Sequence, residues 1–222
     1  VIGSALVDSG LDYSGKIFIG ESITKSVLTI DPAAQVTGCE FVDATIQGTL
    51  DGGSTIRDCK IATLNYVNGI VKSCILSGVI QLSGNAIFLN CWNDIPSTSA
   101  IIDFNNTASS LAVSNYNGKL ILRNKNSAEN VSIDVNSGEI ILENTVTSGT
   151  IVIRGIGELV DSSVGATIDS TYLLSPPAIT DAVLDAPMID HTLAGSIGEA
   201  ISQSGLTTEQ AKQLLLIFVI SL

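Results

Sequence analysis

The fold is decided by the stretch Leu111–Asn124, LAVSNYNGKLILRN, which recurs as Val131–Asn144, VSIDVNSGEIILEN, at a constant offset of 20 residues. Each copy contains short strands rich in β-branched residues, and turn residues that include a glycine separate these strands. Recurrence of such a unit at a short fixed interval is the sequence signature of a solenoid. The two copies therefore predict neighbouring coils of a β-helix.

Aligned positions in the two copies set the register that we expect. The apolar and glycine matches are Val113 with Ile133, Gly118 with Gly138, Leu120 with Ile140 and Leu122 with Leu142. Two further pairs, Lys119 with Glu139 and Arg123 with Glu143, carry opposite charges. In adjacent coils these charges would lie roughly 4.8 Å apart across the ladder. A third, partial copy follows at Ser148–Gly155.

The four cysteines, Cys39, Cys59, Cys74 and Cys91, stand in a second pattern. An apolar residue lies three positions before each, and Gly, Asp, Ser or Asn lies just before it. The first three are followed two positions later by another apolar residue, whereas the fourth copy has Asn93 there. Because residues i and i+2 share one face of a strand, we expect a stacked row of buried, reduced thiols. Disulfides between coils are the alternative.

These repeats predict an all-β chain: a right-handed parallel β-helix with coils of roughly 15–20 residues, followed by a small α-helical C-terminal region. An immunoglobulin-like sandwich is the alternative, but it does not require this register. We expect an N-terminal β region over residues 1–35, the β-helix over 36–173, a proline-rich linker over 174–179 and short helices over 180–222. The linker contains Pro176 and Pro177, which cannot continue a ladder.

The C-terminal region changes its periodicity after the two prolines. Thr180–Leu184 and Leu193–Ile201 are expected as short helices, and Thr207 with Gln210 fits a capping box for a third. The end of that third helix, Leu214–Leu222, is apolar on almost every side. A helix of this kind must be buried, and we expect partner chains to cover it.

Composition excludes several classes of partner. Ten basic and 22 acidic residues give a net charge of −12, which disfavours nucleic acid and anionic membrane surfaces. Although 45% of residues are hydrophobic, no stretch approaches the ~18 apolar residues of a membrane span. The first residues lack the features of a signal peptide, and the start at Val1 suggests a segment of a longer protein.

The sequence offers no catalytic constellation. It contains no phosphate-binding loop, zinc motif or nucleophile elbow. The only histidine, His191, lies far from the cysteines and is interpreted as a surface or interface residue. Asp51 and Asp58 are interpreted as turn-forming side chains, and the sequons at Asn105 and Asn130 as incidental. The other carboxylates considered are Asp43, Asp94, Asp103, Asp134 and Asp161. We therefore expect no catalytic, cofactor-binding or metal-binding residue, no cofactor and no enzymatic activity.

Several stretches resemble bacteriophage tail-fibre and minor tail structural proteins of the β-helix type: Ile46–Leu76, Leu111–Leu142, Thr145–Ser163 and Asp185–Ile201. The resemblance implies a virion component of the tail or a neck or baseplate appendage, assembled in the host cytoplasm. It also implies a homotrimer that contacts other tail or neck proteins. These signatures are structural and carry no chemistry.

Three functions are compatible with this resemblance. The first is a stiff trimeric β-helical shaft. The second is an adhesin that contacts a host surface receptor or glycan, with Asn93–Ser99 as one possible contact loop. The third is a polysaccharide-degrading tailspike, which would need paired acids facing a sugar and aromatic residues in a groove. Only 5% of the residues are aromatic, so the sequence favours the shaft.

Overall fold

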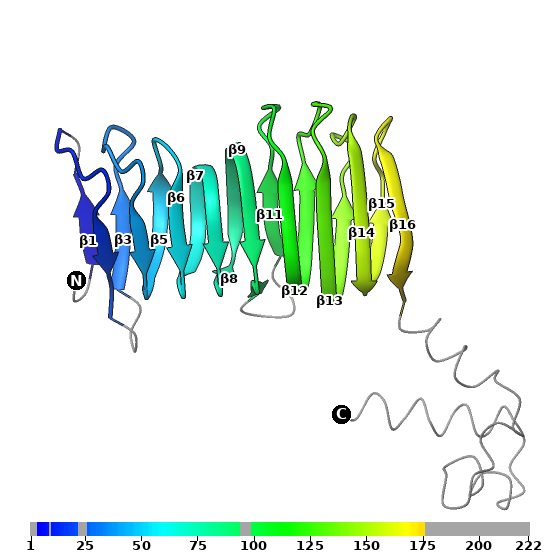
Figure 1. Cartoon of the computed structure of the whole chain (residues 1–222), viewed down its shortest axis with the longest axis horizontal. Coiled ribbons are helices and arrows are strands. Elements are labelled where there is room, and N and C mark those ends of the chain that lie inside the picture. Colours follow the sequence, from blue (N-terminus) through cyan, green and yellow to red (C-terminus); the bar gives the residue numbers. More distant parts are fainter. Residues whose placement is uncertain (1–3, 9, 22–25, 94–98, 176–222) are drawn as a thin grey trace, which may run out of the picture. The chain divides into compact units, whose positions relative to one another are not determined.

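The structure, a computed structural model, describes residues 4–8, 10–21, 26–93 and 99–175. The chain divides into two compact units, Val1–Leu173 and Leu174–Leu222, and nearly all described residues belong to the first. These described residues form an all-β, parallel β-solenoid of about eight turns, as predicted, and contain no helix. Figure 1 shows its strands standing side by side in chain order from β1 to β16. The predicted helices over 180–222 lie outside the described residues, as does most of the proline-rich linker.

Four of the described strands have 12 or 13 residues and bend through a corner, whereas the others have two to eight residues. In chain order the strands are β1 (Ser4–Val7), β2 (Ile17–Ile19), β3 (Ser26–Ile30), β4 (Glu40–Val42), β5 (Ala44–Thr49), β6 (Ser54–Arg57), β7 (Lys60–Lys72), β8 (Ile75–Leu76), β9 (Gly78–Leu89), β10 (Trp92–Asn93), β11 (Ser99–Asp103), β12 (Leu111–Arg123), β13 (Val131–Leu142), β14 (Thr150–Ile156), β15 (Glu158–Asp161) and β16 (Thr167–Leu174).

The strands form two parallel ladders that run the length of the solenoid. The first ladder joins β1, β3, β5, the start of β7, β8 with the start of β9, β10 with β11, the ends of β12 and β13, and β15. The second ladder joins β2, β4, β6, the ends of β7 and β9, the starts of β12 and β13, β14 and β16. Parallel pairing already links β1 with β3 and β2 with β4, so coiling starts before residue 36.

The register of the repeat is confirmed. Gly118 pairs with Gly138 and Leu120 with Ile140. Lys119 also pairs with Glu139, and its Nζ lies 2.7 Å from the Glu139 Oε2. The second charged pair takes another form, because Arg123 Nε bonds Asp103 Oδ2 at 2.8 Å on the preceding coil. The Asp103 side chain is only 8% exposed, and a carboxylate buried to this extent needs a charged or hydrogen-bonding partner.

Coil length varies more than the sequence predicts. Residue 40 pairs with 55 and residue 60 with 75, which gives two intervals of 15. Residue 75 pairs with 92, an interval of 17, and residue 117 pairs with 137, an interval of 20. Between them residue 92 pairs with 117, an interval of 25 that exceeds the expected range. This long coil contains the additional strand β11.

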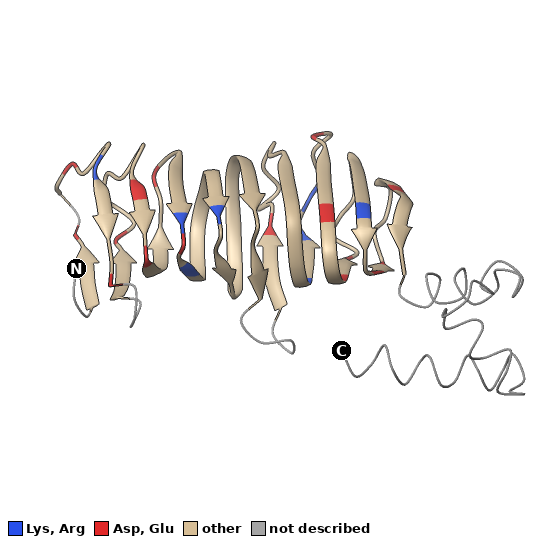
Figure 2. Cartoon of the chain, turned by 60° about the horizontal axis from the view of Figure 1, so that its bottom comes forward, with Lys and Arg blue, Asp and Glu red and all other residues tan. Residues whose placement is uncertain are grey.

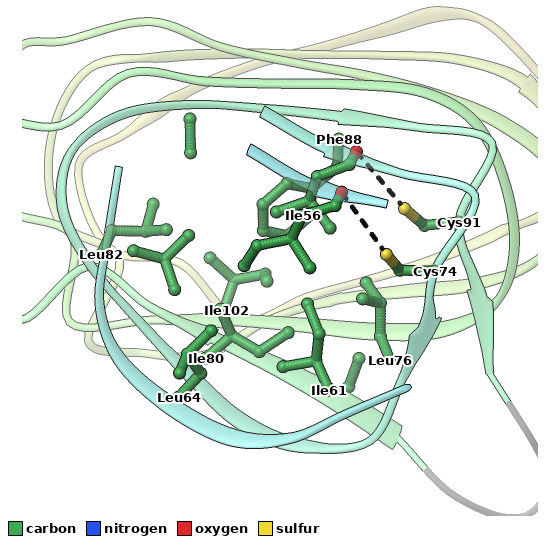
Figure 3. Packing of buried hydrophobic residues seen from close by; sticks show 14 of the residues in the cluster. Ile56, Ile61, Leu64, Cys74, Leu76, Ile80, Leu82, Phe88, Cys91 and Ile102 are labelled. Atoms are coloured by element: carbon green, nitrogen blue, oxygen red, sulfur yellow. Dashed lines mark hydrogen bonds between the residues drawn. The ribbon is translucent and has the colours of Figure 1, made fainter. Parts of the chain in front are cut away.

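The interior is filled by columns of apolar side chains, one residue per coil. One column passes through every coil of the second ladder up to β14. It consists of Phe18, Phe41, Ile56, Val71, Phe88, Val113, Ile133 and Ile153. Each fully buried side chain of this size stabilises the fold by roughly 1.5–3 kcal/mol. Figure 3 shows side chains from successive coils meeting in this interior, with Ile61, Leu64 and Leu76 below Phe88.

One corner of the solenoid is made by left-handed residues. In five successive coils the residue after the second-ladder segment has a φ of 52–56°, at Asp43, Asp58, Ser73, Asn90 and Asn115. Asp and Asn tolerate this conformation better than most residues, because their short side chains bond locally. At the last step Asn115 Nδ2 donates to Asn90 Oδ1 at 3.0 Å. The Asp, Ser or Asn that precedes the last three cysteines is therefore a corner residue.

Candidate functional site

Three of the four cysteines form the expected row. All four cysteines are buried and none forms a disulfide. Ile75 pairs with both Lys60 and Trp92, which stacks Cys59, Cys74 and Cys91 on successive coils. The Cys74 Sγ donates to Lys72 O at 3.2 Å. It also donates to Ile56 O at 3.7 Å, which Figure 3 shows as a dashed line. Burial raises the pKa of the Cys91 thiol to about 11, so this thiol stays protonated and unreactive at neutral pH.

The expectation that Cys39 belongs to this row is wrong. Phe41, two residues after Cys39, pairs with Ile56, three residues before Cys59. Cys39 therefore lies at the corner that enters the second ladder, and its Sγ donates to Tyr13 O at 3.0 Å. Ala44 takes the position below Cys59. The 20-residue spacing between Cys39 and Cys59 equals the period of the later repeat, which suggested that the two residues are equivalent. The coils in this region are shorter, so the two residues occupy different corners.

The row of thiols ends on Tyr116, at the start of the wider coils. Trp92 pairs with Asn117, so the buried Tyr116 stands above Cys91. Its hydroxyl donates to Asn93 Oδ1 at 3.0 Å, and the backbone N–H of Lys119 also donates to that oxygen. The Asn93 Nδ2 donates to Leu76 O at 3.1 Å. The residue that breaks the cysteine pattern thus satisfies the polar tip of a core aromatic side chain.

A shallow groove opens on the outside of this same junction. Its cavity volume is about 490 Å³, and its lining consists of Trp92, Asn93, Asn117, Gly118, Ser137 and Gly138. Register places Trp92, Asn117 and Ser137 at equivalent positions on three successive coils. Trp92 is 39% exposed. We call these six residues the Trp92 groove.

The two glycines hollow out the Trp92 groove. Gly118 has a φ of 121° and Gly138 a φ of 130°, a region that strongly favours glycine. A Cβ on Gly118 would overlap the Asn93 side chain, and one on Gly138 would overlap the Gly118 carbonyl. Backbone conformation and close packing both require glycine here. At Gly118 and Gly138 the wall of the Trp92 groove therefore consists of backbone atoms alone.

A polar network orients Asn117 on the rim. The Asn117 Oδ1 accepts from Asn136 Nδ2 and from Ser137 Oγ, each at 3.1 Å. This arrangement assigns the other end of the amide as Nδ2. Within the described part of the chain, no group accepts a hydrogen bond from that Nδ2. The Trp92 groove therefore presents an apolar ring, an amide donor and a hydroxyl oxygen on three adjacent coils.

The carboxylates singled out in the sequence have structural roles where the structure describes them in detail. Asp51 Oδ1 accepts from the Val36 N–H at 2.9 Å, and Asp58 occupies a left-handed corner, as their interpretation as turn residues predicts. Asp103 accepts from Arg123, from Asn124 Nδ2 at 3.0 Å and from the Asn105 N–H at 2.8 Å. Burial opposes ionisation of Asp103, but these donors prevail and lower its pKa. Asp94 and His191 lie outside the described residues.

One buried cation, Lys125, is also structural. Its Nζ donates to Ser127 O at 2.6 Å and Ser148 O at 3.0 Å, and it lies 5.8 Å from the centre of the Phe104 ring. Burial lowers the pKa of Lys125, against the opposing charge of Glu129. A lysine with a lowered pKa is a candidate nucleophile only where a substrate can reach it. Here the carbonyls of two neighbouring loops bind the ammonium group, so it fastens those loops together.

Comparison of the chain with protein-family models, with curated proteins and with solved structures gives no match. Across residues 4–8, 10–21, 26–93 and 99–175, no three His, Cys, Asp or Glu side chains gather at metal-binding distance. Over the same residues, no helix has the length and apolarity needed to cross a membrane.

Sequence reasoning missed the Trp92 groove. It assigned Asn93 only as a break in the cysteine pattern and gave no role to the single tryptophan beside it. The aligned segments NYNG and VNSG already placed Asn117 on Ser137 and Gly118 on Gly138. The missing information was the pairing of Trp92 with Asn117, which lie farther apart in the sequence than either repeat predicts for neighbouring coils.

Proposed function

We propose that this chain is a structural component of a bacteriophage tail fibre or of a neck or baseplate appendage, in which its β-helix serves as a stiff shaft without catalytic activity. The observation that carries the proposal is the unbroken pair of parallel ladders from β1 to β16 around a filled core. Interiors packed in this way are nearly incompressible. The resemblance of Ile46–Leu76 and Leu111–Leu142 to tail structural proteins supports a location in the tail or neck.

The surface of the solenoid suits such a role. Only 14% of the residues are charged, and Figure 2 shows their positions spread along the coils. Acidic residues outnumber basic ones by 22 to 10, which disfavours binding to nucleic acid. We infer that the partners of the chain are other virion proteins.

The proposal includes assembly as a homotrimer. An outward row on the second ladder contains Ile70 and Ile87, which pair in register and are 41% and 42% exposed. Adjacent exposed isoleucines leave apolar surface in water, and contact with further copies of the chain would bury it. Native mass spectrometry should show a species of about 69 kDa, three times the 23.0 kDa chain. The double variant Ile70→Asp, Ile87→Asp should be monomeric, whereas Val160→Asp, on the other ladder, should leave the trimer intact.

Location is tested on intact particles. Peptides of this chain should be found by mass spectrometry in the tail fraction of purified virions, and antibodies against the solenoid should label the tail or neck in electron micrographs. Their absence from purified virions, with the chain present in the infected cell, would refute the proposal.

A second candidate function, attachment to a host surface receptor or glycan, is favoured by one observation. The Trp92 groove combines an exposed aromatic ring with oriented polar groups. Cleavage of a polysaccharide has less support, because it requires two carboxyl groups flanking the scissile bond. The lining of the Trp92 groove contains neither Asp nor Glu.

A further inference from the structure

We propose that the Trp92 groove binds a neutral saccharide, with a pyranose ring against the indole of Trp92 and its hydroxyls on Asn117 and Ser137. This inference deepens the receptor-binding function and rests on it, but not on the shaft. Sugar binding is measured on the isolated chain, whereas virion location is measured on particles, so either can fail without the other.

The first argument is the exposure of Trp92. Tryptophan is the largest side chain and contributes most when its faces are covered, yet the only tryptophan of the chain is 39% exposed in the wall of a hollow. An indole presents a flat apolar face with a polar N–H at its edge. The face of a pyranose ring that carries C–H groups matches such a surface, while its hydroxyls at the rim remain free to bond.

The second argument is the polarity of the neighbouring coils. The Asn117 amide is held by Asn136 and Ser137 so that its Nδ2 remains a donor. The Ser137 hydroxyl donates to Asn117 and keeps lone pairs that can accept. Sugar hydroxyls both donate and accept, so two hydroxyls on adjacent carbons complement this donor and acceptor. A purely apolar ligand would leave the oriented groups without partners.

The third argument concerns size and charge. From the coil of Trp92 to that of Ser137 there are two inter-strand spacings, or about 9.6 Å, which is comparable to a disaccharide. The lining contains no charged side chain, and the chain carries a net charge of −12. Neutral sugars are therefore favoured over acidic or sulfated ones.

The test uses the full chain with maltose, lactose, cellobiose and N,N′-diacetylchitobiose as probes. Saturation-transfer NMR should show transfer to ring protons of at least one disaccharide. The fluorescence of Trp92, the only tryptophan, should change saturably with a dissociation constant of about a millimolar or tighter. Trp92→Ala should weaken binding by about tenfold or more, and Trp92→Phe should restore part of it. Asn117→Ala should weaken binding severalfold with the aromatic ring intact.

A matched control is Tyr172→Ala, because Tyr172 is 67% exposed on β16, away from the Trp92 groove. This variant should bind like the unmodified chain, and urea unfolding should show that all variants are folded. The proposal is overturned if no disaccharide gives saturation transfer, or if Trp92→Ala binds as well as Tyr172→Ala. It is also overturned if the fluorescence of Trp92 responds to protein concentration rather than to sugar, which would mark a contact between protein chains.

Discussion

The coils on the two sides of Trp92 solve the same packing problem differently. Between Glu40 and Trp92 the coils are narrow, with intervals of 15 to 17 residues, and the thiols of Cys59, Cys74 and Cys91 fill one interior corner. After it the coils are wider, with Asn117 pairing with Ser137, and Tyr116 occupies the corner that the thiols occupied. A small apolar group suits the narrow coil. The junction coil places an aromatic ring there, with Asn93 as the partner of its hydroxyl, and the following coil places Val135 there.

The difference explains why the candidate site lies where it does. Inside the junction, Asn93 accepts a hydrogen bond from the Tyr116 hydroxyl. On the outside, Gly118 and Gly138 have no side chains to fill the surface. A change of coil width therefore produces both a polar core contact and a surface hollow. In a solenoid of uniform coils neither would be required.

The largest effect is expected where the wider coils require glycine because there is no room for a Cβ. Gly138→Ala places a Cβ against the Gly118 carbonyl at a φ of 130°, and combines backbone strain with overpacking. We expect a loss of about 3 kcal/mol or more in the free energy of unfolding, measured in urea. The matched control is Gly10→Ala, where φ is 88° but the added Cβ meets nothing within 4 Å. Equal losses in both variants would contradict the packing argument.

The second prediction concerns the long junction coil, which Asp103 fastens to the next one. Asp103→Asn should lower the free energy of unfolding by about 1.5–3 kcal/mol at pH 7, because Arg123 loses its charged partner. The pKa of Asp103 is lower in the folded than in the unfolded chain. Its stabilisation is thus complete above about pH 4 and is lost as the pH falls through the folded-state pKa. Urea titrations from pH 7 to pH 3 should show the two proteins converging in stability.

The third prediction tests the narrow coils and the position of Cys39. Cys59→Ser should cost about 1–3 kcal/mol, because it buries an imperfectly paired hydroxyl. In double variants, Cys59→Ser and Cys74→Ser should be coupled, since they stand on adjacent coils. Cys39→Ser and Cys91→Ser should be additive, since about three coils separate them. Rapid labelling of all four thiols in the native protein would contradict their burial.

The smallest expected effect concerns the charge pair of the repeat. Lys119 and Glu139 side chains are 34% and 29% exposed, so solvent screens their attraction. A double-mutant cycle with alanine at both positions should give a coupling of only about 0.2–1 kcal/mol at low salt, and less at high salt. A coupling as large as the loss in Asp103→Asn would show that burial does not distinguish the two ion pairs.

The sequence was informative where neighbouring coils have equal length. The match of Leu111–Asn124 with Val131–Asn144 predicted the parallel fold, the glycine pairing and the Lys119–Glu139 contact. A constant sequence offset between neighbouring coils directly gives the residues that pair. The sequence was misleading at Cys39, where the spacing to Cys59 matched the later repeat but not the shorter local coils. It could not reveal the Trp92 groove, since the insertion between Trp92 and Asn117 hides which coils are neighbours. The sequence also could not show which of two acidic residues Arg123 binds. Arg123 pairs with Asp103 and not with the aligned Glu143.

The unequal coil lengths have a mechanical consequence. Hydrogen bonds between parallel strands run along the axis of a solenoid, so a pull on its ends loads them coil by coil. Each coil that detaches shortens the rod by one spacing of about 4.8 Å. It also releases its whole contour, about 50 Å for a narrow coil and about 70 Å for a wide one. A single molecule stretched to failure would therefore release longer steps from the wide coils than from the narrow ones.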